Sequence, residues 1–391
     1  MKRVFTVLAF ALAVTTASAQ YYYQDSANSQ MLRHSERHDP CRTEIILPQV
    51  NGYNVYKADL HNHTVFSDGQ VLPRFRVREA WMDGLDVLAV TDHIEYRPHE
   101  ATFHEYLKGY TDKEHLPGVK GLEKGKQVVD LNFAVSEYLK EAPKYGIVII
   151  PGSEITRDGK TVGHFNALFT KDNNTIYDKD PVQAVRNAKA QGALVMHNHP
   201  GWRKSSLDYT ETEKTVYDEG LVDGVEVMNG AEFYPGIVDR VRERGLFISA
   251  NSDIHFSTAG DYRLSGSGRP MTLILAKDKS LESLREALEA KRTIAYGYNT
   301  LCGDEQLLKD FFMAGIKVNV IYRGGKDMEV ALTNMTSVPY TICLKGHNQS
   351  RISPFCTINI RVGKDTEVLK LSVLNMFCSK DRHPVVELPL K

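Results

Sequence analysis

From Val55 onward, short apolar runs of strand length alternate with longer amphipathic segments. The runs lie at 55–60, 85–90, 147–150, 193–196, 224–228, 246–250 and 271–276, with a short extra alternation at 164–169. Several are separated by helix-like segments, at 73–82, 128–144, 181–191 and 232–244. Strands that alternate with helices favour a mainly parallel sheet, and six or seven such units suit a closed or nearly closed α/β barrel. An open doubly wound sheet is the alternative, but the chain lacks the Gly-rich dinucleotide motif that often accompanies it.

A different pattern begins near residue 300. Strand-like runs at 316–322, 328–333, 340–345, 356–362, 367–373 and 385–388 are separated by turn residues, without helical periodicity. This spacing predicts a small antiparallel β-sandwich over residues 311–391, after a barrel over residues 55–300. Residues 20–54 are predicted to be a tether and strap. The insertion at 96–126 follows a strand, where barrels often carry active-site loops, so it is a possible lid.

The first 19 residues have the order of a signal peptide. Lys2 and Arg3 precede an apolar run at 4–14, and Ala17-Ser18-Ala19 offers small residues for cleavage. No other segment has the length and apolarity of a membrane-spanning helix. We therefore expect an exported protein, periplasmic or secreted.

The balance of charged side chains argues against a nucleic-acid partner. The chain has 48 basic and 49 acidic side chains, so it lacks the basic surplus typical of a protein that grips nucleic acid.

The five cysteines of the chain are an odd number, which leaves at least one thiol unpaired within the chain. Cys343, Cys356 and Cys378 lie on strand-like segments and are predicted to be buried structural thiols.

Metal-type side chains follow nearly every apolar run, at the point where the predicted strand ends. They are His61, His63, Asp68, His93, Glu154, His164, His197, His199, Asp253 and His255. Strand ends of a β/α barrel converge on one face, and residues two apart on a strand point to the same side. Imidazoles and carboxylates are the expected ligands of Zn, Mn or Fe. The set exceeds one tetrahedral zinc site and fits two or three ions, which can share a water and hold phosphoryl oxygens.

These residues resemble the motifs of the PHP family, named for polymerase and histidinol phosphatase. The matching segments are DLHNHTVFSDG at 59–69, VTDH at 90–93, PGSE at 151–154, GH at 163–164, HNHPG at 197–201 and NSDIH at 251–255. The resemblance covers about residues 55–298 and implies a distorted (β/α)7 barrel with up to three metal ions. The added β-sandwich and signal peptide resemble an exported, phosphodiesterase-like subset of the family.

The resemblance also implies three ligand groups. The first is His61, His63, Glu154 and Asp253; the second is Glu154, His164 and His199; the third is Asp68, His93 and His255. Among these ligands, Asp253, His199 and His255 are predicted to act in catalysis. His197 is either a substitute ligand or a phosphate contact, because the His-Pro step of the family falls at His199.

The predicted activity is hydrolysis of phosphate esters, preferably phosphodiesters, by a metal-bridged hydroxide. Predicted substrate contacts are Arg157, His197, Trp202 and Asn229, with Arg203, Arg263 and Arg269 as further phosphate clamps. A phosphomonoesterase remains open. An amidohydrolase-type enzyme is a second alternative, although no strand end offers its usual lysine. A third is a secreted binding protein with a structural metal site, in which the β-sandwich is the working part.

Overall fold

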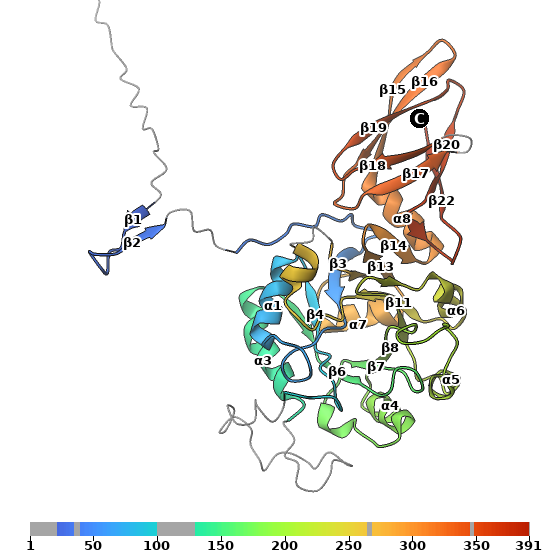
Figure 1. Cartoon of the computed structure of the whole chain (residues 1–391). Helices are drawn as coiled ribbons and strands as arrows, with labels where there is room; N and C mark the ends of the chain where they lie inside the picture. The colour runs from blue at the N-terminus through green and yellow to red at the C-terminus, as the bar shows by residue number, and fades with distance from the viewer. Residues whose placement is uncertain (1–21, 35–39, 100–129, 264–267, 345–347, 391) are drawn as a thin grey trace, which may run out of the picture. The chain divides into compact units, whose positions relative to one another are not determined.

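The computed structural model describes residues 22–34, 40–99, 130–263, 268–344 and 348–390 (Figure 1). The chain divides into two compact units, residues 1–41 and 42–391. In the small unit, β1 (Tyr22–Gln24) and β2 (Leu32–His34) form an antiparallel hairpin. The predicted signal peptide, and all but residues 96–99 of the predicted lid, lie outside the described residues.

In the part of the chain that the structure describes, the first half of the barrel contains three parallel strands and two helices. The strands are β3 (Asn54–Asp59), β4 (Val87–Ala89) and β5 (Val148–Ile150). The helices are α1 (Pro73–Met82), which begins with proline as helices favour, and α3 (Phe133–Glu141), which is followed by the short turn η1 (Ala142–Lys144). These elements put the residues that follow β3 and β4 at the same end of neighbouring strands.

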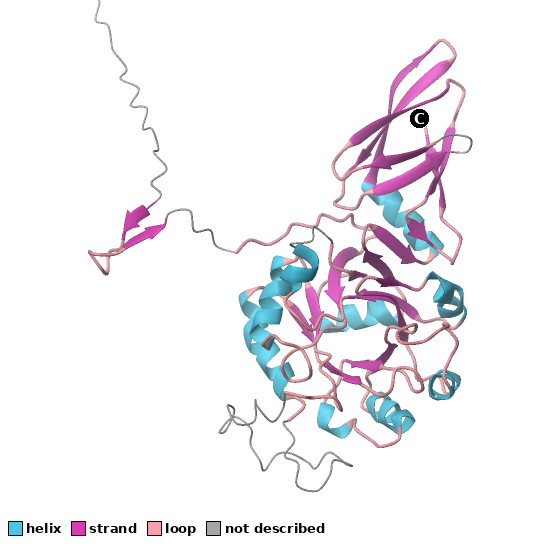
Figure 2. Ribbon diagram, in the orientation of Figure 1, coloured by secondary structure: helices cyan, strands magenta, loops and turns pink. Residues whose placement is uncertain are grey.

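In the second half, β7 runs against the parallel order. After β6 (Gly152–Ile155), β7 (Phe165–Leu168) runs antiparallel to both β6 and β8 (Leu194–His197). The parallel order then resumes with β9 (Gly224–Asn229) and β11 (Phe247–Asn251). Helices α4 (Pro181–Ala190), α5 (Glu211–Asp218) and α6 (Val238–Glu243), with the turn η2 (Asn173–Thr175), lie outside these strands (Figure 2).

Two bridges complete the ring of strands. Asn62, just after β3, pairs in parallel with Ile254, and His93, after β4, pairs with Glu154 of β6. The ring confirms the predicted α/β barrel, and β7 distorts it. Both bridges join residues that carry or flank the predicted ligands, so barrel closure and assembly of the site depend on the same segments.

The prediction of one helix over 232–244 is wrong. Glu232 and Phe233 instead form β10 (Glu232–Phe233), antiparallel to β9, and Pro235 opens the turn η3 (Pro235–Ile237) before α6. Pairing with β9 satisfies backbone N–H and C=O groups of Glu232 and Phe233, so these residues need no helix for their hydrogen bonds. Proline is not tolerated in a helix interior, so a helix over 232–244 would be broken at Pro235.

Further strands extend the first half of the barrel. β12 (Met271–Ala276) pairs antiparallel with β3 and with β13 (Thr293–Gly297), which pairs with β14 (Thr300–Gly303). Helix α7 (Leu281–Glu289) lies between β12 and β13, and β21 (Met376–Phe377), from near the C-terminus, pairs with β14. The chain thus returns briefly to the barrel sheet at β21.

Two antiparallel sheets form the C-terminal part, as predicted. One contains β15 (Ile316–Gly324), β16 (Asp327–Asn334) and β19 (Thr357–Gly363). The other contains β18 (Gln349–Ile352), β17 (Tyr340–Leu344), β20 (Val368–Val373) and β22 (Val385–Pro389). The expectation that helices end near residue 300 is wrong, because α8 (Glu305–Gly315) precedes the sheets and buries Leu308, Phe311 and Phe312.

One cluster of buried apolar side chains joins the barrel to the C-terminal sheets. It includes Leu88 of the barrel, Phe312 of α8, and Tyr340 and Leu371 of the sheets. The rings of Phe312 and Tyr340 pack edge to face, with their centroids 4.8 Å apart. The sheets therefore share a core with the barrel.

A strap at residues 42–50 also links the two parts. Arg42 donates to the backbone oxygens of Gly84 and Leu85 and pairs with Asp86 at 2.7 Å. Farther along, the backbone of Ile46 exchanges hydrogen bonds with Ser337, at 2.9 Å to its hydroxyl and 2.8 Å from its amide. These contacts hold the segment against both the barrel and the C-terminal sheets.

None of the five cysteines, all of which lie within the described residues, forms a disulfide. Cys378 is buried as predicted and Cys343 is partly buried, but the prediction for Cys356 is wrong because that residue is exposed. Cys356 lies one residue before β19 begins, outside the alternation that would bury it. Among the described residues, no helix combines the length and apolarity needed to cross a membrane.

Candidate metal centre

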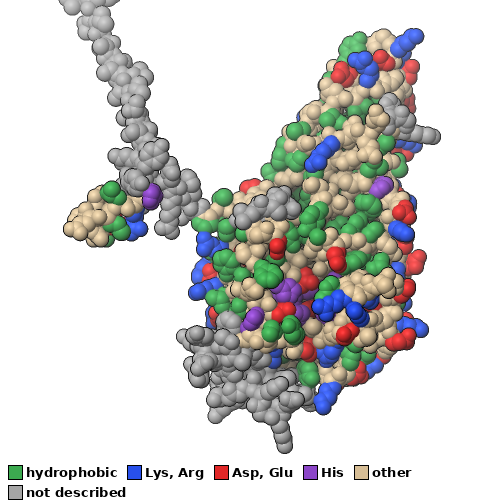
Figure 3. Space-filling model, in the orientation of Figure 1, with side chains coloured by type: hydrophobic (Ala, Val, Ile, Leu, Met, Phe, Trp, Pro, Cys, Tyr) green, Lys and Arg blue, Asp and Glu red, His purple; other side chains and the backbone are tan. Residues whose placement is uncertain are grey.

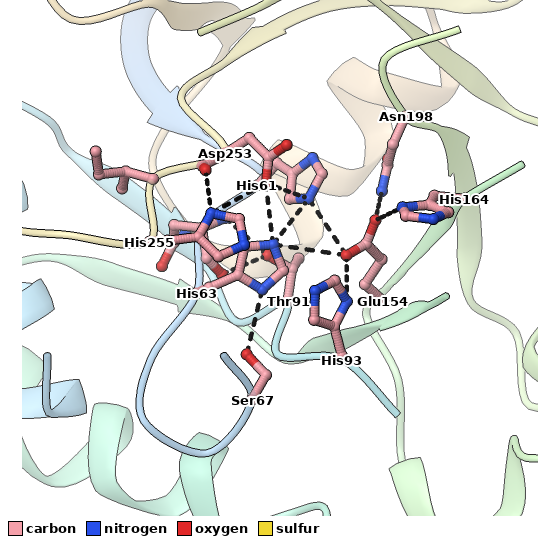
Figure 4. A network of polar contacts seen from close by, with 12 residues as sticks. His61, His63, Ser67, Thr91, His93, Glu154, His164, Asn198, Asp253 and His255 are labelled. Carbon is pink, nitrogen blue, oxygen red and sulfur yellow. Dashed lines mark hydrogen bonds and ion pairs between the residues drawn. The ribbon is translucent and has the colours of Figure 1, made fainter. Parts of the chain in front are cut away.

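The ends of the barrel strands deliver the predicted ligands to one place (Figure 4). Three follow β3, one follows β4, one lies on β6, one precedes β7, one follows β8 and two follow β11. All nine fall into groups whose ligand atoms lie within 4.8 Å of one another: His61, His63, Asp68, His93, Glu154, His164, His199, Asp253 and His255. The structure thus brings together residues that are up to 194 positions apart, from His61 to His255.

The first group consists of four ligand atoms from buried or partly buried residues. His61 Nε2, His63 Nε2 and Asp253 Oδ1 lie 3.0 to 3.2 Å from one another. Glu154 Oε2 lies 3.5 Å from both imidazole nitrogens. Ligand atoms about 2.1 Å from one tetrahedral ion lie about 3.4 Å apart, so this spacing fits a single ion.

Glu154 connects the first group to the second. Its Oε2 faces His61 and His63, whereas its Oε1 lies 3.2 Å from His164 Nδ1 and 3.8 Å from His199 Nε2. The two oxygens of Asp253 likewise face different groups. Oδ1 lies beside His61 and His63, whereas Oδ2 lies 3.8 Å from His199 Nε2. Two carboxylates that each face two ligand groups are suited to bridging adjacent ions.

The third group lies around Asp68. Asp68 Oδ1 is 3.3 Å from His93 Nε2 and 3.1 Å from His255 Nε2. His255 presents Nε2 to Asp68 because its Nδ1 bonds the backbone oxygen of Asp253 at 2.8 Å. This group, too, has the composition of a metal site.

Several buried polar atoms of the cluster lack a hydrogen-bond partner among the described residues. They include Asp68 Oδ1, Glu154 Oε2 and His164 Nδ1. Native proteins rarely leave buried polar groups unsatisfied. The unsatisfied atoms are ligand-type atoms within the groups described above, so the residues fit divalent metal ions.

The electrostatics of the cluster keep its acids ionised. Burial raises the pKa of Glu154, but His93, His61 and His164 outweigh it and hold the pKa well below its usual value. Burial lowers the pKa of His63 to about 3, and His93 and His255 act in the same direction. Ionised carboxylates beside a neutral imidazole are the protonation states that metal binding requires.

Surrounding polar groups orient the ligands. Asp92 accepts hydrogen bonds from Thr64 and from Ser67, whose hydroxyl also lies 3.3 Å from His63 Nδ1. On the far side, Asn198 donates to Glu154 Oε1 at 2.8 Å. His164 bonds the backbone oxygen of Arg157 through Nε2 at 2.6 Å, which leaves its Nδ1 facing Glu154. Such supporting bonds fix the ring orientation of metal-binding histidines.

Sequence reasoning missed one buried acid at the centre, Glu226. It lies in the middle of β9, within an apolar run, and its side chain is fully buried. Its Oε1 lies 2.9 Å from His61 Nδ1. The signal in the sequence was a single acidic residue inside an otherwise apolar strand. Burying a carboxylate costs free energy unless the group is paired or hydrogen-bonded.

A cavity of about 850 Å³ opens onto the cluster. All nine predicted ligands except His61 and His63 line it, together with the predicted substrate contacts Arg157, Trp202 and Asn229. Histidine atoms are visible on this part of the surface beside Lys and Arg atoms (Figure 3). The metal-type residues are therefore accessible to a small ligand.

Trp202 forms a wall of the cavity. Its ring lies 5.3 Å from the ring of His164 and 5.2 Å from that of His199, centroid to centroid. A Cβ added at Gly159 would lie 2.6 Å from the indole, so only glycine leaves room for this position. Arg203 also lines the cavity and stacks on the indole, with its guanidinium carbon 4.2 Å from the centroid.

The arginines predicted as phosphate clamps differ in availability. Arg157 lines the cavity, but its guanidinium pairs with Glu95 and donates to the backbone oxygens of Thr156 and Asp178. The prediction of Arg269 as a phosphate clamp is wrong, because its side chain is buried. Its guanidinium nitrogens pair with Asp59 Oδ2 at 2.5 Å and with Asp83 Oδ2 at 3.0 Å. The side chain of Arg263 lies outside the described residues.

The assignment of His197 as a ligand or phosphate contact is wrong. Both of its ring nitrogens are occupied, Nδ1 by the Tyr217 hydroxyl at 2.9 Å and Nε2 by Glu213 at 3.1 Å. The rule that residues two apart share a side fails here because β8 ends at His197. His199 then adopts a φ of 25°, which turns it toward the cluster.

Exchanging these two histidines for glutamine separates their roles. We expect His197→Gln to retain the bound metal but to lose about 1–3 kcal/mol of stability, because Glu213 and Tyr217 lose a buried partner. We expect His199→Gln to lose metal. Metal analysis and chemical denaturation of both variants test this, and metal loss in His197→Gln would restore that residue as a ligand.

The comparisons with known proteins agree with this geometry. A family model described as the PHP domain matches residues 59–241. A two-domain protein of Bacteroides vulgatus that contains a predicted PHP-like metal-dependent phosphoesterase is 33% identical. The match covers 90% of this chain and 100% of that one, with a TM-score of 0.79. This chain belongs to the PHP family.

Other solved structures are more distant from this PHP protein. A metal-dependent phosphoesterase of Bifidobacterium adolescentis, assigned as putative, is 15% identical over 59% of this chain and 95% of that one, with a TM-score of 0.37. An amidohydrolase of Chromobacterium violaceum is 16% identical over 52% of this chain and 89% of that one, with a TM-score of 0.35. None of the curated protein sequences matches this chain. The family and the two-domain fold therefore rest on the Bacteroides vulgatus protein and the PHP model.

Proposed function

We infer that this PHP protein is an exported enzyme that hydrolyses phosphate esters, preferably phosphodiesters, with two or three divalent ions of Zn, Mn or Fe. The observation that carries this inference is the shared cluster of nine ligand-type residues beneath an open cavity, with Glu154 and Asp253 each facing two groups. When bound, such ions supply Lewis acidity, lower the pKa of a water and neutralise phosphoryl oxygens.

The residues of the chain would hold and orient the reacting groups. Asp253, His199 and His255 line the cavity, so they are in a position to contact the phosphoryl group as well as an ion. Asn229 keeps Asp253 in place, because its Nδ2 lies 3.3 Å from Asp253 Oδ2. Fixed ligands and fixed donors cost little reorganisation during reaction, which favours electrostatic stabilisation of developing charge.

The cavity wall supports a substrate with groups on both sides of the phosphate. Trp202 offers an apolar surface directly beside His164 and His199, where one ester group could pack and exclude water. No lysine lines this cavity among the described residues, and Arg157 is paired with Glu95. The other arginine of the lining is Arg203, which stacks on Trp202. A site with few free cations suits the single charge of a diester better than the double charge of a monoester.

The test uses the full chain without its predicted signal peptide. We expect metal analysis to give two or three ions per chain, and chelation to abolish hydrolysis that Mn or Zn then restores. We expect turnover of bis-nitrophenyl phosphate to exceed that of nitrophenyl phosphate by at least about tenfold, a difference of about 1.4 kcal/mol in transition-state binding. A monoester preference would overturn the diester assignment, and activity that survives metal removal would overturn the metal mechanism.

A further inference from the structure

We propose that Glu226 is a positioning residue of the metal centre, which holds both His61 and His199 in the orientation that presents their Nε2 atoms to the ions. The inference rests on the metal-binding part of the proposed function and is independent of the substrate. It concerns a residue that no motif of the sequence marks.

Each oxygen of Glu226 accepts two hydrogen bonds. Oε1 lies 2.9 Å from His61 Nδ1 and 2.9 Å from Asn251 Nδ2. Oε2 accepts from the backbone amide of His199 at 2.7 Å and from Asn229 Nδ2 at 2.9 Å. A carboxylate has about four acceptor sites, so Glu226 is saturated by these donors and is not itself free to bind an ion.

The bond to His61 determines which ring nitrogen faces the cluster. A carboxylate accepts only a protonated nitrogen, so the proton of the neutral ring lies on Nδ1. Nε2 then carries the free lone pair, 3.1 Å from His63 Nε2 and 3.2 Å from Asp253 Oδ1. Such outer carboxylates fix the tautomer and rotation of a metal-binding imidazole.

The bond to His199 supports an uncommon backbone conformation. His199 has a φ of 25°, in a region that residues other than glycine rarely adopt and that surrounding contacts must stabilise. The hydrogen bond of its amide to Glu226 Oε2 is such a contact. This turn directs the His199 ring to Glu154 and Asp253, in contrast to His197, which faces Glu213.

Glu226 thereby bonds two ligands of the centre, His61 and His199, which form a close group with Asp253. Asn229 connects Glu226 to Asp253, because its Nδ2 lies 2.9 Å from Glu226 Oε2 and 3.3 Å from Asp253 Oδ2. Among the described residues, no lysine or arginine forms an ion pair with Glu226, which pairs with His61. The negative charge of Glu226 thus remains directed at the metal centre.

The principal experiment compares Glu226→Gln with Glu213→Gln in the full chain. Both acids are buried in the same barrel and both bond a histidine, but Glu213 bonds His197, which is not a ligand. In Glu226→Gln, the amide NH₂ must face donors. We expect its affinity for Zn or Co(II) to fall by about 10–100-fold, and the visible spectrum of the Co(II) form to change. We expect both properties to be unaltered in Glu213→Gln.

Thermal unfolding with and without metal distinguishes positioning from a general structural role. We expect the rise in Tm on adding Zn to shrink in Glu226→Gln, while the Tm of the metal-free form changes less. Wild-type metal affinity and an unchanged Co(II) spectrum in Glu226→Gln would overturn the inference and leave the proposed function intact. A wild-type chain that binds no metal would overturn both.

A measurement on the unaltered chain keeps the inference testable if Glu226→Gln does not fold. With ¹⁵N-labelled histidine and bound Zn, NMR identifies which nitrogen of each ring carries a proton, and comparison with His61→Gln assigns the His61 signal. We expect the proton on Nδ1. A proton on Nε2 of His61 would overturn the inference.

Discussion

Replacing Glu154 with glutamine is expected to lower kcat/KM for a phosphate ester by at least about 10³-fold, equivalent to about 4 kcal/mol. The two oxygens of Glu154 face different ligand groups, at 3.5 Å from His61 and 3.2 Å from His164. The amide of glutamine has the same shape but no charge, and one of its ends is a donor. We therefore expect bound metal to decrease together with activity, which metal analysis of the purified variant measures.

The control for this variant is Glu282→Gln, in the exposed first turn of α7. It makes the same change of charge away from the cavity, and we expect activity and metal content to match those of the unaltered chain. If Glu154→Gln retained full metal content and activity, Glu154 could not be a shared ligand, and the division of the centre into adjacent groups would be wrong.

Deletion of residues 311–391 is expected to leave an insoluble protein. The deletion removes Phe311, Phe312 and all seven strands of the C-terminal sheets, and it exposes the apolar side chains that face them across the shared core. Large exposed apolar patches promote aggregation. Sedimentation of the expressed protein tests this, and a soluble, active fragment would favour the alternative in which the sheets serve attachment to a surface or glycan.

A point variant gives the same information without removing a segment. We expect Phe312→Ala to lower the free energy of unfolding by about 3–5 kcal/mol, because Phe312 is fully buried against Tyr340. Its control is Phe355→Ala, whose side chain is 55% exposed and whose effect should stay within about 0.5 kcal/mol. Equal, small effects in both variants would show that the shared core contributes little.

The arrangement of the barrel strands and the residues of the metal centre could be predicted from the sequence. Each apolar run is a local pattern, and the ligand-type residues stand at its end, as Asp253 and His255 do after β11. Parallel strands bring these ends to one face wherever the rest of the chain lies. This is why all nine predicted ligands come together, although they are spread over most of the barrel sequence.

Only the tertiary structure decided which polar residues serve the centre and which serve the core. His197 and His199 are equivalent as sequence, but a backbone turn at His199 sends their rings to different partners. In the sequence, Glu226 is a single acid within a strand-like run. Only the position of β9 in the barrel brings it beside His61. Helix α8 and the division of the oxygens of Glu154 are likewise fixed by neighbours far along the chain. Local patterns determine where along a strand a side chain is placed, whereas contacts across the barrel determine which groups that side chain bonds.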